Sequence, residues 1–441
     1  MANSGKHNYS FQFHWSDFIR KGYQSRRRSV AMDYHDSARA GELADRANAL
    51  MEEVVLPLER ERTGGMSVSA GTIAELRETA REEYGIYAPQ ISEAHGGMGE
   101  SFRDALPVFE EAGRSLLGAS AMRVDAPDEG NMHLLELAGD ELQKETYLDP
   151  LVAGDIVSGF SMTEPLQGAG SDPKMIETTA EKDGDEWVLD GHKWWTSNGL
   201  EADVLFVLAR TDFEAHPYQG CSIFIVPVDA EGVEVLRDVP HLGEGNGSSH
   251  AEILYENVRV PEAHLLGELN GGFVHAQQRL GPARLTHCMR FSGMAQRALE
   301  IAKAYTSERE GFGTTLSEKQ SIRHRIADAE TRLHVARTAI RDAADRIAAG
   351  EEARVRVSMC KPFTANVTQD AIDLAVQCCG ANGIGRDLPL ASFYESVRMF
   401  RIVDGADEVH RRVISRHAFE DVDEAELEPL TRFGDPRPRR E

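Results

Sequence analysis

The sequence lacks long apolar runs and paired cysteine motifs. No stretch approaches the roughly 18 consecutive apolar residues of a membrane-spanning helix, and no apolar segment follows the basic cluster at residues 26–28 as it would in a signal peptide. The five cysteines form no CxxC pair, and an odd number fits a reducing compartment better than a disulfide framework. We therefore expect no membrane insertion, a cytoplasmic location, cysteines packed in the core and no metal site.

Positive charge is also scarce. The 441 residues contain 48 Lys and Arg against 73 Asp and Glu, a formal net charge of −25. A surface of this sign repels a phosphate backbone, so we expect no nucleic-acid partner. The acidity is spread over predicted helices and arginine outnumbers lysine, which favours the hypothesis of adaptation to high salt. An ordinary acidic cytosolic protein is the alternative.

The hydrophobic pattern divides the chain into three regions. Apolar residues recur at helical spacing over residues 32–158, short β-branched runs bounded by turn residues occupy 159–270, and helical periodicity returns over 271–419. A chain of this length can hold two or three domains. We predict an α+β fold with an N-terminal helical domain, a middle β domain and a C-terminal helical bundle.

Both ends of the chain lack such patterning. Residues 1–31 are polar and basic, and we predict a disordered extension; a start at Met32 and a targeting role of the basic prefix are the alternatives. Residues 420–441 are acidic and then rich in proline and arginine, which predicts a solvated tail.

Two segments beside the predicted β domain favour a bound cofactor. Thr163-Glu-Pro165 precedes the glycine-rich loop at residues 168–172, and Lys193-Trp-Trp-Thr-Ser-Asn-Gly199 follows one predicted strand. Hydroxyls and exposed amides can meet ring heteroatoms, and an indole can stack on a planar ring. The residues therefore favour a planar cofactor with a polar rim; a glycine turn beside core tryptophans is the alternative.

These segments resemble the TEPxAGSD and KxWITNG signatures of the acyl-CoA dehydrogenase family, and the resemblance runs from about residue 40 to 418. The runs at residues 126–132 and 279–290 look most similar to the branch of family members ten and eleven. The resemblance implies FAD-dependent α,β-dehydrogenation of an acyl-CoA thioester to the trans-2-enoyl-CoA. It also implies electron transfer to an electron-transferring flavoprotein, assembly as a homodimer or homotetramer, and a sequence that contains only the dehydrogenase portion.

The resemblance assigns site residues position by position. Some of the cofactor residues, Arg309 and Gln377 among them, are expected to complete the FAD site of a neighbouring subunit. The substrate-binding residues are Ser171, Arg284 and Gly405. The implied FAD-binding residues are Met162, Thr163, Ser171, Trp195, Ser197, Arg309, Phe312, Gln320, Gln377, Ala381, Ala406 and Glu408.

Asp404 is the predicted catalytic base. This chain reads Val403-Asp-Gly-Ala406 where many relatives have tyrosine, glutamate, glycine and threonine. The other base position known in the family holds Pro282-Ala283, which cannot take a proton. Three purely structural alternatives stay open: Asp404 as a helix cap, Arg284 in a structural salt bridge, and Arg309 as a surface charge.

Two rival functions stay open. A relative that uses aspartate as its base, nitroalkane oxidase, shares the scaffold, so an oxidase is one alternative. A DNA-associated or non-enzymatic flavoprotein is the other, although the net charge and the acid at position 404 argue against it. The inserted Leu166-Gln167 also departs from the family pattern and leaves the contacts of that loop open.

Overall fold

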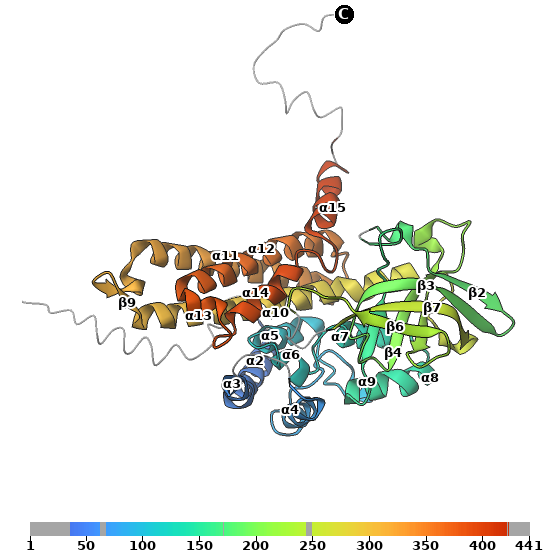
Figure 1. The fold of residues 1–441 in the computed structure, drawn as a ribbon, viewed down its shortest axis with the longest axis horizontal. Coiled ribbons are helices and arrows are strands. Elements are labelled where there is room, and N and C mark those ends of the chain that lie inside the picture. Colours follow the sequence, from blue (N-terminus) through green and yellow to red (C-terminus); the bar gives the residue numbers. More distant parts are fainter. Residues whose placement is uncertain (1–35, 62–67, 171, 244–248, 421, 423–441) are drawn as a thin grey trace, which may run out of the picture.

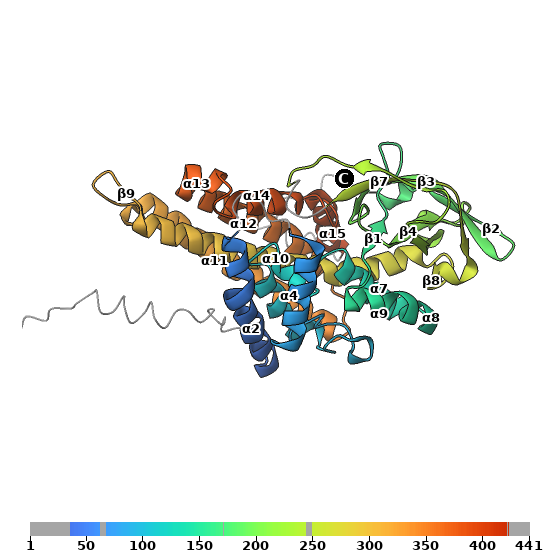
Figure 2. The same cartoon turned by 60° about the horizontal axis from the view of Figure 1, so that its bottom comes forward.

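The structure is a computed structural model that describes residues 36–61, 68–170, 172–243, 249–420 and 422. The predicted extension, Ser171 and nearly all of the predicted tail lie outside the described residues. Figures 1 and 2 show a β domain at one end of the molecule, a long helical bundle that extends away from it, and a smaller group of helices packed along one side. The predicted fold class is confirmed.

The N-terminal region consists of short helices. Those of one or more full turns are α2 (Ala38–Leu50), α3 (Leu56–Arg60), α4 (Ala70–Glu82), α5 (Phe102–Ala112), α6 (Gly118–Ala121), α7 (Asp128–Ala138) and α9 (Asp149–Ala153), with a brief α8 (Glu141–Gln143). In α2 the buried residues are Ala40, Leu43, Ala47 and Leu50. This spacing gives an amphipathic helix whose apolar side faces the core.

The middle region forms an eight-stranded sheet in the order β6-β7-β3-β2-β4-β5-β8, with β1 parallel to β4. The strands are β1 (Ser158–Ser161), β2 (Thr179–Asp183), β3 (Glu186–Ser197), β4 (Val204–Arg210), β5 (Cys221–Pro227), β6 (Val233–Asp238), β7 (His250–Pro261) and β8 (Leu265–Leu266). The central strands β4 and β5 are buried along almost their whole length. Their continuous β-branched and aromatic runs are typical of strands covered on both faces.

The C-terminal region is the helical bundle. Its helices are α10 (Gly272–Glu308), α11 (Gln320–Ala348), α12 (Arg354–Cys379), α13 (Ala381–Ile384), α14 (Leu390–Met399) and α15 (Asp407–Glu420). A hairpin of β9 (Glu310–Gly311) and β10 (Thr314–Thr315) joins α10 to α11 at the tip farthest from the sheet (Figure 1). The five cysteines are buried and unpaired, which confirms their predicted place in the core.

Helix α10 links all three regions. A Cβ atom on Gly293 would lie 1.8 Å from the carbonyl oxygen of Glu110, so glycine allows α10 and α5 to touch through their backbones. The same helix begins beside β5 and ends at the β9 hairpin. Within the described ranges, no helix is both long and apolar enough to cross a membrane.

Candidate active site

The turn before α15 places Asp404 in a strained conformation. Asp404 and the following Gly405 have φ of +57° and +93°, a left-handed pair that is costly for the aspartate. The backbone is held by three donors from three helices. Arg284 Nε and His410 Nε2 lie 2.9 and 3.1 Å from the Asp404 carbonyl oxygen, and Lys361 Nζ donates to the Gly405 carbonyl at 2.8 Å. These three side chains, Arg284, Lys361 and His410, form a clamp that holds the turn through its backbone carbonyls and not through the carboxylate of Asp404.

The carboxylate of Asp404 is left without a donor. Its side chain is 14% exposed, yet Oδ2 is buried and accepts no hydrogen bond from any described residue. The nearest group, Nδ1 of His287, lies 3.1 Å away but donates to the carbonyl of Ala283 at 2.8 Å. The helix-cap alternative for Asp404 is therefore wrong in this structure, because the side chain caps no helix within the described ranges.

The surroundings keep Asp404 ionised. Burial alone would raise the pKa of its carboxyl group. The adjacent imidazole and the guanidinium groups of Arg284 and Arg279 outweigh burial and hold this pKa below its ordinary value. Arg284 has no carboxylate within ion-pair distance among the described residues, so the salt-bridge alternative is also not supported. A charged, donor-free carboxylate is a ready proton acceptor.

The run at residues 126–132 ties α7 to its neighbours. Asn131 donates to Ser158 of β1 at 2.8 Å and accepts from Arg279 of α10 at 2.8 Å. Asp128 pairs with Arg123 at 2.7 Å, and both side chains are buried. The sequence marked these residues only as a branch pattern. These buried polar contacts fix α7, which lies beside Asp404. The sequence alone could not reveal this role, because the contacting side chains are distant in sequence.

A buried ion pair joins the two segments that are predicted to contact the flavin. Lys193 Nζ is 2.8 Å from Glu164 Oε1 and 3.0 Å from the carbonyl of Met162. Glu164 also accepts the backbone N–H groups of Glu177 and Thr178 at 2.8 and 2.9 Å. Although burial opposes ionisation, Lys193 and these donors hold the pKa of Glu164 at about 2. Sequence reasoning missed this pair, although both residues stand inside the recognised motifs.

The same pair of segments brings the predicted flavin residues together. The backbone N–H of Trp194 donates to the carbonyl of Thr163 at 2.9 Å. A register shift between Lys193 and Thr196 interrupts the pairing of β3 with β7, and Trp195 in this irregularity has φ of +57° and 40% exposure. Ser197 Oγ lies 3.1 Å from Nδ1 of His250. Thr163, Trp195 and Ser197 thus lie at one junction, and their contact with the flavin stays a prediction.

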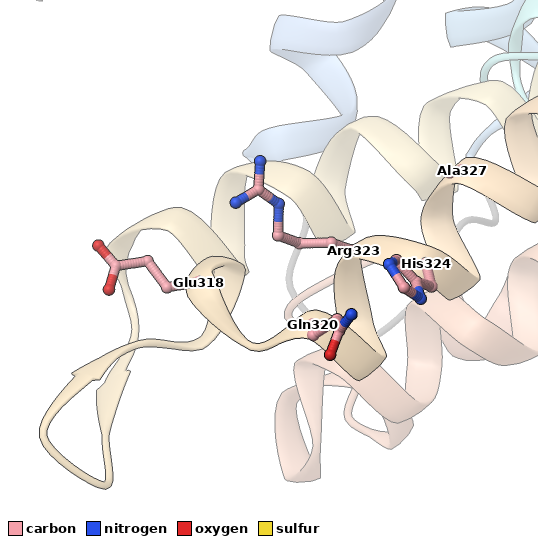
Figure 3. A pocket seen from close by; sticks show the side chains of 5 residues that line it. All are labelled: Glu318, Gln320, Arg323, His324 and Ala327. Atoms are coloured by element: carbon pink, nitrogen blue, oxygen red, sulfur yellow. The ribbon is translucent and has the colours of Figure 1, made fainter. Parts of the chain in front are cut away.

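Five other predicted cofactor residues lie at the far tip of the bundle. Phe312 in the β9–β10 turn has φ of +57° and 98% exposure. The predicted residues at this tip are all exposed: Arg309, Phe312, Gln320, Gln377 and Ala381. An open pocket of about 530 Å³ lies at the start of α11, lined by Glu318, Gln320, Arg323, His324 and Ala327 (Figure 3).

The two groups of predicted residues are far apart within one chain. Arg284 and Glu308 are separated along α10 by 24 residues, roughly 36 Å at the rise of an α-helix. Figure 1 shows the sheet and the β9 hairpin at opposite ends of the molecule. Ala406 and Glu408, by contrast, lie directly beside Asp404 at the start of α15. One chain therefore brings together only part of the predicted cofactor site.

Family models match nearly the whole described chain. The N-terminal, middle and C-terminal domains of acyl-CoA dehydrogenases match residues 37–155, 159–258 and 270–419, respectively. The chain belongs to the acyl-CoA dehydrogenase family. It is an enzyme of this family, an oxidoreductase that acts on CH–CH groups.

Curated relatives agree with this assignment. The probable acyl-CoA dehydrogenase FadE2 of Mycobacterium tuberculosis is 39% identical over 396 residues, which cover 87% of this chain and 96% of that protein. Acyl-CoA dehydrogenase family member 11 of Gallus gallus is 33% identical over 402 residues, 87% of this chain and 51% of that protein. Member 10 of Mus musculus is 34% identical over 380 residues, 83% of this chain and 36% of its own length. The chain thus spans about half of the first of these two relatives and about a third of the second, and the predicted resemblance to members ten and eleven is confirmed.

Solved structures share the fold. Butyryl-CoA dehydrogenase from Megasphaera elsdenii has a TM-score of 0.79 at 27% identity, covering 88% of this chain and 100% of its own. A structure from Mycobacterium abscessus that is assigned to acyl-CoA dehydrogenases has a TM-score of 0.82 at 35% identity, covering 88% of this chain and 99% of its own.

Proposed function

We propose that the protein is an FAD-dependent acyl-CoA dehydrogenase that converts an acyl-CoA thioester to its trans-2-enoyl-CoA and passes the electrons to an electron-transferring flavoprotein. One observation carries the proposal. No described residue donates a hydrogen bond to either oxygen of the ionised Asp404 carboxylate, which sits on a turn that three other side chains hold in place. A base that must take a weakly acidic proton needs at least one carboxylate oxygen that no donor occupies.

Asp404 acts as the α-proton base in this proposal. Its carboxylate takes the Cα proton of the thioester, and the electron pair of that C–H bond becomes the new Cα–Cβ π bond as the Cβ hydrogen leaves as a hydride. The backbone N–H of Asp404 donates to no described residue. It is therefore available for the thioester oxygen, where negative charge develops. FAD, when bound, supplies the hydride acceptor.

The residues present fit FAD. Thr163, Trp195 and Ser197 offer hydroxyls and a half-exposed indole beside Met162, and Ala406 and Glu408 lie next to the base. At the other tip, Arg309 forms no ion pair with a described residue and Phe312 is almost wholly exposed. A guanidinium group suits a pyrophosphate. The exposed Phe312 beside this guanidinium supports the proposal that another chain covers the tip.

We further propose that two chains form each site. The far tip supplies Arg309, Phe312, Gln320, Gln377 and Ala381 to a neighbour's cofactor, because about 36 Å of helix separates this tip from the base in one chain. A homodimer or homotetramer satisfies this arrangement. Arg284 and Gly405 would contact the CoA substrate beside the base; the part assigned to Ser171 and the cytoplasmic location stay predictions.

Anaerobic mixing with a panel of acyl-CoA thioesters tests the proposed reaction. We expect the purified protein to be yellow, its visible flavin absorbance to bleach with at least one thioester, and oxygen to restore it slowly. An added electron-transferring flavoprotein should restore it faster. Rapid hydrogen peroxide formation from a nitroalkane, with no bleaching by any thioester, would instead select the oxidase.

A further inference from the structure

His287 lies against the carboxylate of the proposed base. It stands one turn after Arg284 on α10, so the two side chains emerge on the same helix face. Its Nδ1 is 2.8 Å from the carbonyl oxygen of Ala283 and 3.1 Å from Oδ2 of Asp404. Because a carbonyl oxygen only accepts, Nδ1 carries the hydrogen. A single N–H donor therefore stands between two acceptors, one of them the unpaired oxygen of Asp404.

Two aromatic rings hold the imidazole in place. The plane of the His287 ring is tilted by 23° and 28° from those of Phe400 and Phe291, with centroid distances of 5.8 and 6.3 Å. Its side chain is 17% exposed. Burial lowers the pKa of His287 below its ordinary value although Asp404 opposes this, which favours a neutral ring at pH 7. Its N–H can reach Oδ2 after a small rotation, and it keeps the Ala283 carbonyl as a partner when Asp404 is protonated.

We propose that His287 is the positioning residue for the catalytic base: its neutral Nδ1–H binds Oδ2 of Asp404 and turns the other carboxylate oxygen to the substrate. The inference rests on the proposed function, because it requires Asp404 to take the α-proton. Aspartate is one methylene shorter than the glutamate usual in the family. Its reach is smaller, so the orientation of the carboxylate has greater influence on the rate.

Other charged groups face this pair, and they bear on its pH dependence. The arginines stay charged across the accessible pH range, whereas burial lowers the pKa of Lys361. Burial raises the pKa of Glu129, so its titration must be separated from that of Asp404. The groups are Arg279, Arg284 and Arg290 of α10, Glu129 of α7, Lys361 of α12 and His410 of α15.

Two substitutions separate the donor from the ring. His287→Phe keeps an aromatic ring beside Phe291 and Phe400 but removes the donor. His287→Asn loses the ring but places an N–H at the position of Nδ1. With the FAD-loaded enzyme, we expect His287→Phe to slow flavin reduction about tenfold, the loss of one hydrogen bond to a charged group. The acid limb of the pH profile of kcat/KM should move to higher pH, because the lost donor favours the charged form of the Asp404 carboxylate. His287→Asn should recover most of the rate of flavin reduction, and the acid limb of its pH profile should lie near the wild-type position.

Two controls accompany the pair. His264→Phe removes another half-buried imidazole that contacts a backbone carbonyl, that of Ile225 at 2.7 Å, and should leave reduction unchanged. The shift in the acid limb should persist in a Glu129→Gln background. Histidine ¹⁵N spectra of the wild-type protein give a reading that needs no variant: at pH 7 His287 should be neutral and protonated at Nδ1.

Several results would overturn the inference. A wild-type rate and an unmoved acid limb in His287→Phe would do so, as would an equal defect in His287→Asn or an Nε2-protonated ring. These differ from failure of the proposed function. If no acyl-CoA reduces the wild-type flavin, or if Asp404→Asn is reduced normally, the proposed reaction or its base is wrong and the inference falls with it.

Discussion

The two ends of the helical bundle differ in how completely their polar groups are paired. Around Asp404, Arg284, Lys361 and His410 all bind backbone carbonyls of one short turn. At the β9 hairpin, Arg309 has no ion-pair partner among the described residues and Phe312 is 98% exposed. At the first end, hydrogen bonds within the chain hold the turn that carries the proposed base. At the second end, the predicted cofactor residues are exposed on the surface. This difference supports the proposal that a second chain completes the site.

Mixing two inactive variants would test whether these halves meet between chains. Asp404→Asn and Arg309→Ala should each lose most acyl-CoA dehydrogenation. Refolding an equal mixture with FAD should restore activity in roughly a quarter of the sites, because a hybrid pair contains one site with both native residues. Steady-state rates of the mixture, compared with each variant refolded alone, measure the recovery. No gain in the mixture, despite hybrids detected by mass, would place both residues in the same chain's site.

Loss of a buried ion pair should destabilise the protein more than loss of an exposed ion pair. Replacing Glu164 by Gln leaves the fully buried Lys193 without its counter-charge, which should cost about 3–5 kcal/mol of unfolding free energy. Glu262→Gln breaks the exposed pair with Lys182 and should cost about 0–1 kcal/mol. Denaturant titration of both variants gives the difference. Equal losses would mean that the Glu164 pair does not anchor the flavin-side loop.

Acid should weaken the Asp404 end at a pH where few surface carboxylates titrate. Burial lowers the pKa of His410 to about 4 and lowers that of His287 as well, whereas unfolded histidine titrates near 6.5. The unfolded state thus binds more protons between these values, so stability is lost as pH falls from about 6.5 toward 4. With each group contributing up to about 1.4 kcal/mol per pH unit, the expected slope is roughly 1–3 kcal/mol per pH unit. Thermal unfolding between pH 5 and 7 measures it, and a flat profile would contradict the neutral buried histidines.

Some features could be predicted from the sequence because they depend on local pattern. The three-domain order follows from apolar periodicity, and Thr163, Trp195 and Ser197 stand in recognisable motifs. Asp404 is predicted as the base because its neighbours in sequence match a family pattern and the alternative position cannot ionise. These predictions needed no knowledge of which distant residues meet. The high-salt hypothesis and the assembly state remain predictions.

Other features depend on contacts between distant segments. Glu164 and Lys193 both stand in the motifs, yet only folding makes them a buried pair that supports the flavin-side loop. His287 is separated from Asp404 by more than a hundred residues, and no periodicity indicates that they meet. The left-handed conformation of Asp404 is likewise imposed by the clamp from α10, α12 and α15.

Single-turnover flavin reduction in Asp404→Asn tests the central claim most directly. Asparagine tolerates a positive φ, so the strained turn should survive the change, but the amide cannot take the α-proton. We predict that reduction by a good acyl-CoA substrate slows by roughly 10²-fold or more, while FAD content and CoA binding stay at wild-type levels. Reduction at a near-normal rate in this variant would contradict the assignment of Asp404 as the base.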